Sequence, residues 1–244
     1  MDAQAAFAAC EATVQRVDPD RYFSALFAPA DKRPLLFALY ALNHELARIG
    51  EIVREPMMGE IRLQWWRETV EAARAGKPRA HDVAVALAEV FRRADLPAQI
   101  FDAMIEARSF DSSPDPFAGD VARNGYLDAT SGNLMRLAAR ILDGGDTHDG
   151  LAREAGIAYG LAGLLRSEPL HVSRRKSFLR DAAAAAADAH AHLRRARAMP
   201  RPGSALPAFL PATFVPLYLR NPTRQVPLYR KQFAMLMASL RGRV

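Results

Sequence analysis

The sequence predicts an all-α fold. Along its 244 residues, apolar side chains recur at the three- to four-residue spacing of a helix rather than at alternate positions. Proline and glycine interrupt these segments at intervals that are typical of helices joined by loops. A chain of this length can bury its core as one helical domain, so we expect a single domain over residues 1–244.

Two pairs of aspartate and proline mark the starts of the first predicted helices. Asp18 precedes Pro19, and Asp31 precedes Pro34. Aspartate can cap free backbone amides, and proline is tolerated in the first helical turn. The helices that start there cover residues 18–28 and 32–54. The second has one apolar stripe, which consists of Leu35, Leu36, Leu39, Leu42, Leu46, Ile49 and Val53.

Helical periodicity continues through the middle of the chain. The next predicted helices cover residues 57–75, 82–93 and 97–108. Residues 112–116 contain serine, aspartate and two prolines, which predict a loop. Further helices are expected at residues 124–142 and 149–166, with a break at Pro169.

The last third begins with an alanine-rich helix over residues 181–199. Six consecutive alanines favour a helix there, because alanine has the highest helix propensity. A turn at residues 201–203 follows, and prolines then interrupt the apolar residues 205–219. The final predicted helix is amphipathic, and its apolar side carries Tyr229, Phe233, Leu236, Met237 and Leu240.

Neither an export signal nor a membrane span is predicted. The single cysteine, Cys10, cannot form an internal disulfide. Asp2 and Glu11 interrupt the region where a secretory signal would be basic and then apolar. The apolar residues 205–219 are fewer than the about 20 that a spanning helix needs, and they include three prolines. We therefore expect a cytoplasmic protein.

Positive charge is concentrated in the last third of the chain. Residues 171–244 contain 14 Arg and Lys against Asp181 and Asp188, whereas the net charge of the whole chain is only +6. An anionic membrane surface, a diphosphate, an acidic partner or a solvated helix face would each suit this pattern. Nucleic acid is not expected as a partner, because no reading motif or interleaved aromatic platform accompanies the basic residues.

An ordered set of motifs resembles those of squalene/phytoene synthases. The segments, in order, are Arg21-Tyr22-Phe23, Phe27-Ala28-Pro29, Arg33, Ala38-Leu39-Tyr40-Ala41, Leu63-Gln64-Trp65-Trp66-Arg67, residues 126–132 and Leu164-Leu165-Arg166. Together they cover nearly the whole chain. The resemblance implies an isoprenoid-synthase-type, single-domain helical bundle around a central cavity.

The acidic motifs of that family are largely missing. Each of two helices in such synthases carries an Asp-x-x-x-Asp pair that holds magnesium against a prenyl diphosphate, which stabilises the leaving group. The corresponding residues here are Ala47 and Glu51, then Ser167 and His171. Alanine, serine and neutral histidine do not replace carboxylates around a hard cation. Glu51 and His171 also lack the ligand spacing that would indicate another metal site.

Two further family positions have changed. Four residues after Tyr40, this chain has His44 where the family has a phosphate-binding arginine. On the second helix it has Gly163 where the family has an asparagine. We therefore expect no catalytic residue, no metal and no cofactor. The alternative is an active prenyl-diphosphate transferase of isoprenoid biosynthesis, in which Tyr40, Glu51 and Arg166 act with Mg²⁺ in an altered arrangement.

One subgroup of the family matches better. Residues 55–67 and 164–171 resemble bacterial relatives of a mitochondrial NADH:ubiquinone oxidoreductase (complex I) assembly factor. The resemblance implies a non-catalytic helper, peripheral on the inner face of the cytoplasmic membrane, whose partner is a respiratory-complex subunit or assembly intermediate. A third hypothesis is a lipid-carrying module that holds an isoprenoid or other apolar ligand in the cavity.

The C-terminal segments combine apolar and basic residues in the way of an interfacial helix. The candidate membrane-surface residues are Arg201, Phe209, Phe214, Tyr218, Arg220, Arg224 and Arg230. The alternative is that these segments complete the helical core.

Three residues near the first motif have plain structural explanations. Trp65 and Trp66 point about 100° apart on a helix, so at least one of them is expected in the core. His81 is expected in a loop or at a helix cap.

Overall fold

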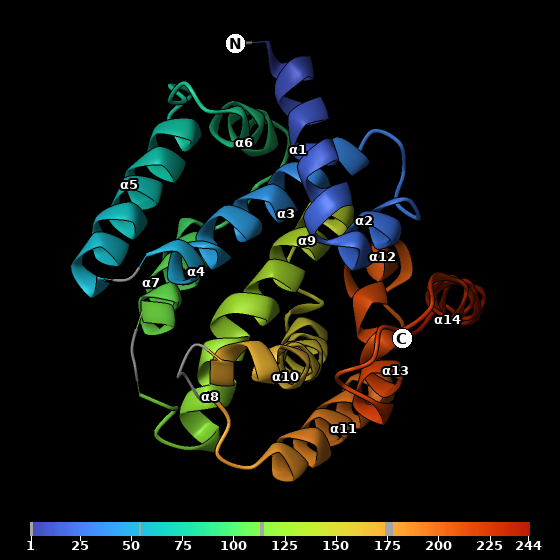
Figure 1. The fold of residues 1–244 in the computed structure, drawn as a ribbon. Helices are drawn as coiled ribbons and strands as arrows, with labels where there is room; N and C mark the ends of the chain where they lie inside the picture. Colours follow the sequence, from blue (N-terminus) through green and yellow to red (C-terminus); the bar gives the residue numbers. More distant parts are fainter. Residues whose placement is uncertain (1, 54, 113–114, 174–177) are drawn as a thin grey trace. The chain divides into compact units, whose positions relative to one another are not determined.

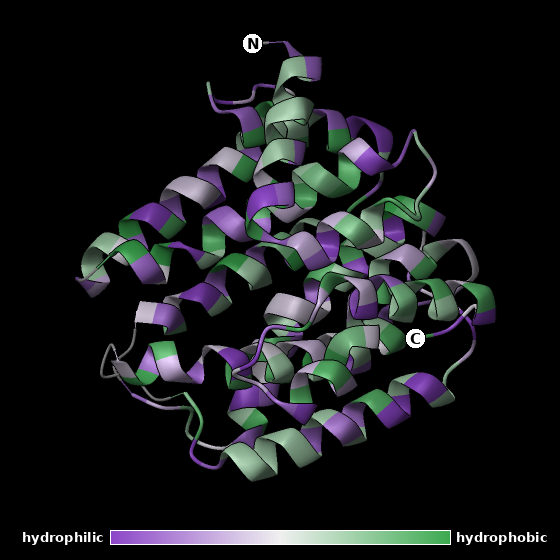
Figure 2. Cartoon of the chain, turned by 45° about the vertical axis from the view of Figure 1, so that its right-hand side comes forward, coloured by the Kyte–Doolittle hydropathy of each residue, from purple (hydrophilic) through white to green (hydrophobic). Residues whose placement is uncertain are grey.

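A computed structural model of the chain describes residues 2–53, 55–112, 115–173 and 178–244 (Figure 1). Every regular element in these ranges is helical, which confirms the predicted all-α fold. Most helices carry both polar and apolar residues, as Figure 2 shows. Amphipathic helices of this kind are stabilised mainly by packing their apolar sides together.

The chain divides into two compact units. Unit 1 contains residues 1–113 and 137–146, and unit 2 contains residues 114–136 and 147–244. The expectation of a single domain stays a prediction.

Unit 1 is built on α3, whose residues from Leu35 to Leu42 are all buried. α1 and α6 both pack against α3 and against each other, and α5 packs against α6 and α7. The helices are α1 (Ala3–Val17), α2 (Pro19–Ala25), α3 (Arg33–Ala47), α4 (Ile49–Ile52), α5 (Pro56–Arg74), α6 (Asp82–Arg93) and α7 (Ala98–Ala107), followed by a 3-10 helix (Arg108–Ser112).

α1 was not predicted. It buries only Ala6, Cys10 and Val14, a row of small residues at intervals of four. Such a row gives little apolar contrast in a segment that is otherwise rich in alanine. Asp2 caps the helix by accepting a hydrogen bond from the Gln4 amide at 3.2 Å.

The Cys10 thiol should be inert in the folded protein. Burial raises its pKa to about 12, and the carboxylates of Asp82 and Glu45 act in the same direction. Because the thiolate is the reactive form, we expect a disulfide reagent to modify Cys10 at least roughly a hundredfold more slowly in native than in denatured protein. Equal rates in buffer and in guanidinium chloride would contradict this burial.

Unit 2 is organised around the long helix α10, which packs along α11 and a short π-helix. Its elements are α8 (Asp120–Leu127), the π-helix (Asp128–Gly132), α10 (Asp149–Ser173), α11 (Ala182–Ala198), α12 (Leu206–Phe209), α13 (Val215–Arg220) and α14 (Leu228–Arg241). Two 3-10 helices flank α12, at Gly203–Ala205 and Leu210–Phe214. α9 (Asn133–Asp143) begins in unit 2 and continues into unit 1.

Glycine allows α10 to approach the π-helix at backbone contact distance. A Cβ on Gly156 would lie 2.5 Å from the Gly132 Cα and 2.6 Å from the Gly132 nitrogen. One turn later, a Cβ on Gly160 would lie 2.7 Å from the Leu127 side chain. Gly156 thus packs directly on main chain, and Gly160 leaves room for the side chain of Leu127.

The expected break at Pro169 is wrong. α10 runs through Pro169 and ends at Ser173. Pro169 removes the hydrogen bond of its own amide and crowds the carbonyl of Leu165, but only four residues of the 25-residue helix follow it. The Ser173 hydroxyl donates to the Leu170 carbonyl at 2.8 Å within that last turn.

A partly buried polar cluster joins α8, α10 and α11. His192 Nδ1 lies 2.7 Å from Glu154 Oε2, and Arg195 donates to the same oxygen at 2.7 Å. Asn124 donates to Asp188 at 2.9 Å, and Arg123, only 5 % exposed, also donates to Asp188. The cluster therefore fixes three helices of unit 2 through charged hydrogen bonds.

Acidification should weaken this cluster through Glu154. Burial favours the neutral acid, but hydrogen bonds from Arg195 and His192 outweigh it and hold the pKa of Glu154 below its ordinary value. A lowered folded-state pKa contributes stability that is present above the unfolded pKa of about 4.3 and is lost as the pH falls through the folded pKa. Glu154→Gln should therefore lower the free energy of unfolding by about 1–2 kcal/mol at pH 7. Below about pH 4.3, the free energy of unfolding of this variant should fall less steeply with decreasing pH.

Urea unfolding at a series of pH values measures both effects. The exposed Glu11→Gln variant, which changes the net charge equally, is the matched control. If the free energies of unfolding of Glu154→Gln and of the unaltered protein fall equally steeply in acid, this role of Glu154 is contradicted.

Candidate functional site

The first set of family motif positions, which are Tyr40, His44, Ala47 and Glu51, lies in unit 1. Tyr40 is 2 % exposed and belongs to the core of α3. Burial raises the pKa of Tyr40 far above its ordinary value, and the nearby Arg21 offsets this only in part. Arg21 lies 5.9 Å from the Tyr40 ring centre and pairs with Asp18 at 2.6 Å. Tyr40 is thus a neutral, packed phenol.

A turn at Arg48 separates the two positions of the first acidic pair. α3 ends at Ala47, and Glu51 lies on the short helix α4. The Glu51 amide bonds to the Arg48 carbonyl, three residues back, at 3.0 Å. The Glu51 side chain is exposed, whereas His44 and Ala47 are half-buried. The remaining carboxylate therefore lies beyond the end of the helix that carries Tyr40.

The second half of the motif lies on α10 in unit 2. Gly163, Ser167 and His171 follow one another at intervals of four, so they share one side of the helix. A Cβ on Gly163 would meet no atom within 4 Å. The ring of His171 packs edge-on against Phe178, with 4.6 Å between ring centres. Aromatic packing of this kind is the observed environment of His171.

Arg166 stacks on an aromatic ring. Its guanidinium carbon lies 3.9 Å from the ring centre of Tyr218. Lys231 Nζ lies 5.2 Å from the same ring centre. Cation–π contacts at these distances stabilise packing of α13 against its neighbours. Arg166 thus has a structural partner in unit 2.

The residues at the motif positions do not fit a magnesium site. Mg²⁺ prefers oxygen ligands in octahedral geometry, and Glu51 is the one carboxylate among the four acidic positions of the family. Over the described residues, no group of three or more His, Cys, Asp or Glu side chains is placed to hold a metal ion. The absence of a cofactor stays a prediction, as does an isoprenoid in a central cavity.

The aromatic members of the predicted membrane surface are corrected by the structure. Phe209 and Phe214 are 0 % exposed and Tyr218 is 2 % exposed. The prolines divide this segment into short helical turns that pack on α10, which places these rings in the core of unit 2. The alternative that the segment completes the core is therefore confirmed for them.

The basic members of that surface are exposed, namely Arg201, Arg220, Arg224 and Arg230. None of the helices in the described ranges is both long enough and apolar enough to span a bilayer. Contact of these arginines with lipid stays a prediction.

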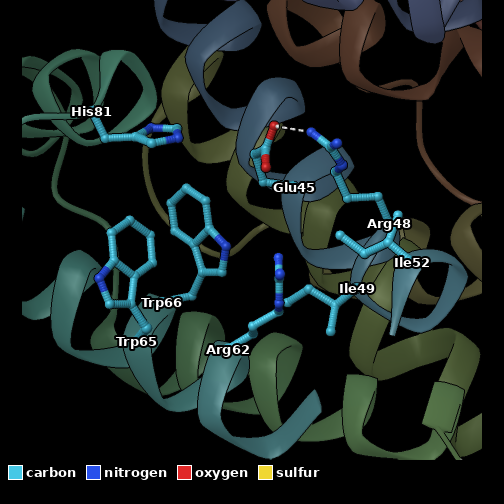
Figure 3. Close-up of a pocket in the computed structure, with 8 residues that line it drawn as sticks. All are labelled: Glu45, Arg48, Ile49, Ile52, Arg62, Trp65, Trp66 and His81. Atoms are coloured by element: carbon cyan, nitrogen blue, oxygen red, sulfur yellow. Dashed lines mark hydrogen bonds and ion pairs between the residues drawn. The ribbon is translucent and has the colours of Figure 1, made fainter. Parts of the chain in front are cut away.

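A pocket of about 270 Å³ in unit 1 was not predicted (Figure 3). Its lining residues come from α3, α4, α5 and the start of α6, and they are Glu45, Arg48, Ile49, Ile52, Arg62, Trp65, Trp66 and His81. Arg48 and Glu45 form an ion pair at 3.3 Å across its upper edge. On α3, Glu45 lies roughly 100–140° around the helix from Tyr40 and His44, so the part of the pocket that α3 lines is on another side of this helix than those two motif positions.

The predictions for the tryptophans and His81 are confirmed. Trp66 is 4 % exposed and packs in the core, whereas Trp65 is 39 % exposed. His81 is the N-cap of α6, and its Nδ1 accepts a hydrogen bond from the Val83 amide at 3.2 Å. The same imidazole packs edge-on against both indoles, so it closes one side of the pocket.

Sequence comparison matches the chain to a protein family and to curated relatives. The family model described as squalene/phytoene synthase matches residues 14–181. NADH dehydrogenase (ubiquinone) complex I, assembly factor 6, of Homo sapiens is 32 % identical over 171 residues, which are 70 % of this chain and 51 % of that protein. The protein of the same description from Mus musculus is 29 % identical over the same length. The chain thus spans about half the length of these curated relatives.

Structural comparison gives the fold. A dehydrosqualene synthase crystal structure matches with a TM-score of 0.82 at 15 % identity, over 98 % of this chain and 97 % of that chain. A squalene synthase from Alicyclobacillus acidocaldarius matches with a TM-score of 0.73 at 17 % identity, over 98 % and 95 % of the two chains. These matches confirm the predicted isoprenoid-synthase-type fold.

Proposed function

We propose that this chain, which belongs to the squalene/phytoene synthase family, is a non-catalytic, membrane-peripheral assembly or scaffold factor for a respiratory complex of the complex I type. The observation that carries the proposal is the residue set Ala47, Glu51, Ser167 and His171 at the acidic positions of the family. Ionisation of an allylic diphosphate needs metal ions that neutralise the leaving group, and one carboxylate cannot gather them.

The sequence relatives support the assembly role. Proteins described as complex I assembly factor 6 share 32 % and 29 % identity with this chain in Homo sapiens and Mus musculus. The aligned 171 residues cover 70 % of the chain. A respiratory-complex subunit or an assembly intermediate is therefore the proposed partner.

The environments of the retained family residues also support a scaffold. Tyr40 is buried and neutral at physiological pH, so its phenol is not poised as an acid or base. Arg166 stacks on Tyr218. Both residues are explained by packing within their own units.

The alternative is an active prenyl-diphosphate transferase that uses Tyr40, Glu51 and Arg166. Incubation with farnesyl or geranylgeranyl diphosphate and Mg²⁺, followed by assay of pyrophosphate and of the condensed hydrocarbon, separates the two functions. We expect no turnover in parallel with an active relative as the control. Turnover that Glu51→Ala abolishes would establish the transferase and overturn the proposal.

The assembly role has a direct test in the organism that encodes the chain. Deletion of the gene should lower the amount and activity of assembled NADH:ubiquinone oxidoreductase while leaving other respiratory enzymes intact. Complementation with a Glu51→Ala variant should restore the complex fully, because the carboxylate has no proposed role. Unchanged complex in the deletion strain, or loss of isoprenoid products instead, would count against the proposal.

The inherited fold is also proposed to hold an isoprenoid or another apolar ligand. Loss of the acidic pairs does not by itself fill the space between helices. Native mass spectrometry of the purified protein should then show a lipid-sized adduct that organic extraction removes. A mass equal to that of the bare chain would contradict this ligand.

A further inference from the structure

The helix α14 presents an exposed row of large apolar side chains. This apolar ridge consists of Tyr229, Phe233, Leu236 and Leu240, which are 65 %, 65 %, 50 % and 73 % exposed. The residues are spaced by four, three and four positions, so they form one continuous stripe about 16 Å long. Single exposed apolar residues are ordinary, but a continuous stripe of aromatic and leucine side chains indicates a binding surface.

The opposite side of α14 fixes the helix to unit 2. Met235 and Ala238 are its buried residues, and α14 packs against the 3-10 helix Leu210–Phe214. At 100° per residue, these two residues lie roughly opposite the centre of the apolar ridge. Packing of the inner side therefore holds the apolar ridge facing outward, parallel to the surface of unit 2.

A groove rich in arginine runs beside the apolar ridge. It has a volume of about 570 Å³, and Phe233 and Met237 form its apolar wall. Arg197, Arg241 and Arg243 also line it, and none of the described lining residues is Asp or Glu. Arg197 donates to the main-chain oxygen of Val244 at 3.1 Å. This arginine groove places positive charge directly against the apolar ridge.

The whole C-terminal region lacks acidic side chains. Asp188 is the last Asp or Glu in the sequence, and residues 189–244 contain nine arginines and one lysine. Arg224 and Arg230 are exposed near the start of α14, and Arg241 and Arg243 near its end. The charged side chains of this C-terminal region are therefore all positive, and positive charge attracts anions of every kind.

We propose that α14 is the surface by which this chain binds an anionic phospholipid bilayer. The apolar ridge enters the boundary between headgroups and acyl chains, and the arginine groove receives lipid phosphates. An interfacial helix has this division into an apolar side and a basic side, and its affinity adds apolar burial to electrostatic attraction. The inference rests on the membrane-peripheral part of the proposed function and names the residues that perform it.

The combination of features favours lipid over an acidic protein. A free phosphate, or a peptide that carries only acidic side chains, would use the arginine groove alone and leave the apolar ridge in water. A second copy of this chain would bring together two surfaces that are both strongly basic, which is unfavourable. A bilayer of anionic lipid satisfies both surfaces at once.

Vesicle flotation with the full chain tests the proposal. Vesicles of phosphatidylcholine mixed with phosphatidylglycerol should bind the protein at least roughly tenfold better than vesicles of phosphatidylcholine alone. High salt should weaken that binding, because screening shortens the reach of the arginines. Inorganic phosphate, at an ionic strength matched with chloride, should compete no better than chloride does.

Two double variants separate the contributions. Phe233→Ser with Leu240→Ser should lower the partition coefficient on anionic vesicles at least roughly tenfold, since two apolar side chains no longer enter the bilayer. Arg241→Glu with Arg243→Glu should lower it by a similar factor. The matched controls are Met57→Ser with Ile61→Ser, and Arg16→Glu with Lys77→Glu, all exposed residues of unit 1.

Several results would overturn the proposal. These are equal binding to neutral vesicles, binding that survives the Phe233→Ser/Leu240→Ser variant, and equal losses in the controls. Direct binding of inorganic phosphate to the protein, without binding of vesicles, would identify a site for free phosphate instead. A dimer in light scattering that the ridge variant dissociates, with vesicle binding unchanged, would make the apolar ridge a self-association surface. Because complex assembly is measured separately by gene deletion, failure here is distinguishable from failure of the assembly role.

Discussion

Replacing Gly156 with alanine should destabilise the protein by about 3 kcal/mol, the upper end of the range for overpacking a core. A Cβ at this position would lie 2.5 Å from the Gly132 Cα and 2.9 Å from the Ser131 carbonyl carbon. Both atoms belong to main chain, so no side-chain rotation relieves the contact. The π-helix and α10 must separate, and unit 2 loses part of its packing. Urea unfolding followed by circular dichroism measures the change.

The same helix offers a matched control. Gly163 also lies within α10, but a Cβ there meets no atom within 4 Å. Gly163→Ala should therefore stabilise the protein by roughly 0.5–1 kcal/mol, because alanine loses less backbone entropy than glycine in a helix. Equal effects of the two substitutions would show that helix propensity, rather than contact with Gly132, decides the result.

Replacing Arg123 with methionine should cost about 2–3 kcal/mol, because it removes the charged hydrogen bonds of a buried guanidinium to Asp188, which is only partly exposed. Arg123 donates to Asp120 at 2.8 Å, to Asn124 at 3.1 Å and to Asp188. Methionine keeps the apolar stem of the side chain but leaves the Asp188 carboxylate short of a partner. α8 should then detach from α11 more readily. Thermal and urea unfolding measure the loss of stability.

A double-mutant cycle identifies the contribution of the ion pair. Asp188→Asn added to Arg123→Met removes the unpaired charge, so the double variant should be more stable than the sum of the single effects predicts. Asp120→Asn is the surface control, since that carboxylate is 77 % exposed and should contribute less than about 0.5 kcal/mol. Strict additivity in the cycle would contradict direct coupling of Arg123 and Asp188.

The sequence predicted helices best where local signals agree. Residues 82–93 were predicted and observed without a shift, because His81 caps the first turn and an apolar stripe fills the rest. α5 and α11 each lie within a residue of their predicted bounds at both ends. α1 was missed because its buried side chains are small, and Pro169 was taken as a stop although α10 continues for four residues beyond it.

The predicted helix over residues 32–54 is interrupted at Arg48, and the one over residues 124–142 contains a π-helix. Neither interruption has a proline or a distinctive residue pattern in the sequence. Gly50 and Gly132 accompany them, and their effect depends on close neighbours that only the folded chain brings near. Tertiary packing thus decided these local conformations.

The sequence predicted only part of the candidate site correctly. The motif positions could be placed on α3, α4 and α10 because the resemblance aligned ordered segments along the chain. Burial of Phe209, Phe214 and Tyr218 could not be predicted, since apolar area beside arginines fits a core and a membrane surface equally well. The pocket beside Trp65 and Trp66 forms where α3, α5 and α6 pack close together. The residue spacing within one helix does not predict which other helices pack against it.

The turn at Arg48 affects how easily substitutions could restore an acidic pair at positions 47 and 51. A single back-substitution of Ala47 to aspartate would return one charge, yet it would stand at the end of α3 while Glu51 stands on α4. Two carboxylates aligned on one uninterrupted helix would need the main chain to be rebuilt as well as the codon changed. A lineage that mutates one residue at a time would pass through forms that carry the acidic residues of the family motif without its geometry, so restoring the acidic pair takes more than restoring its residues.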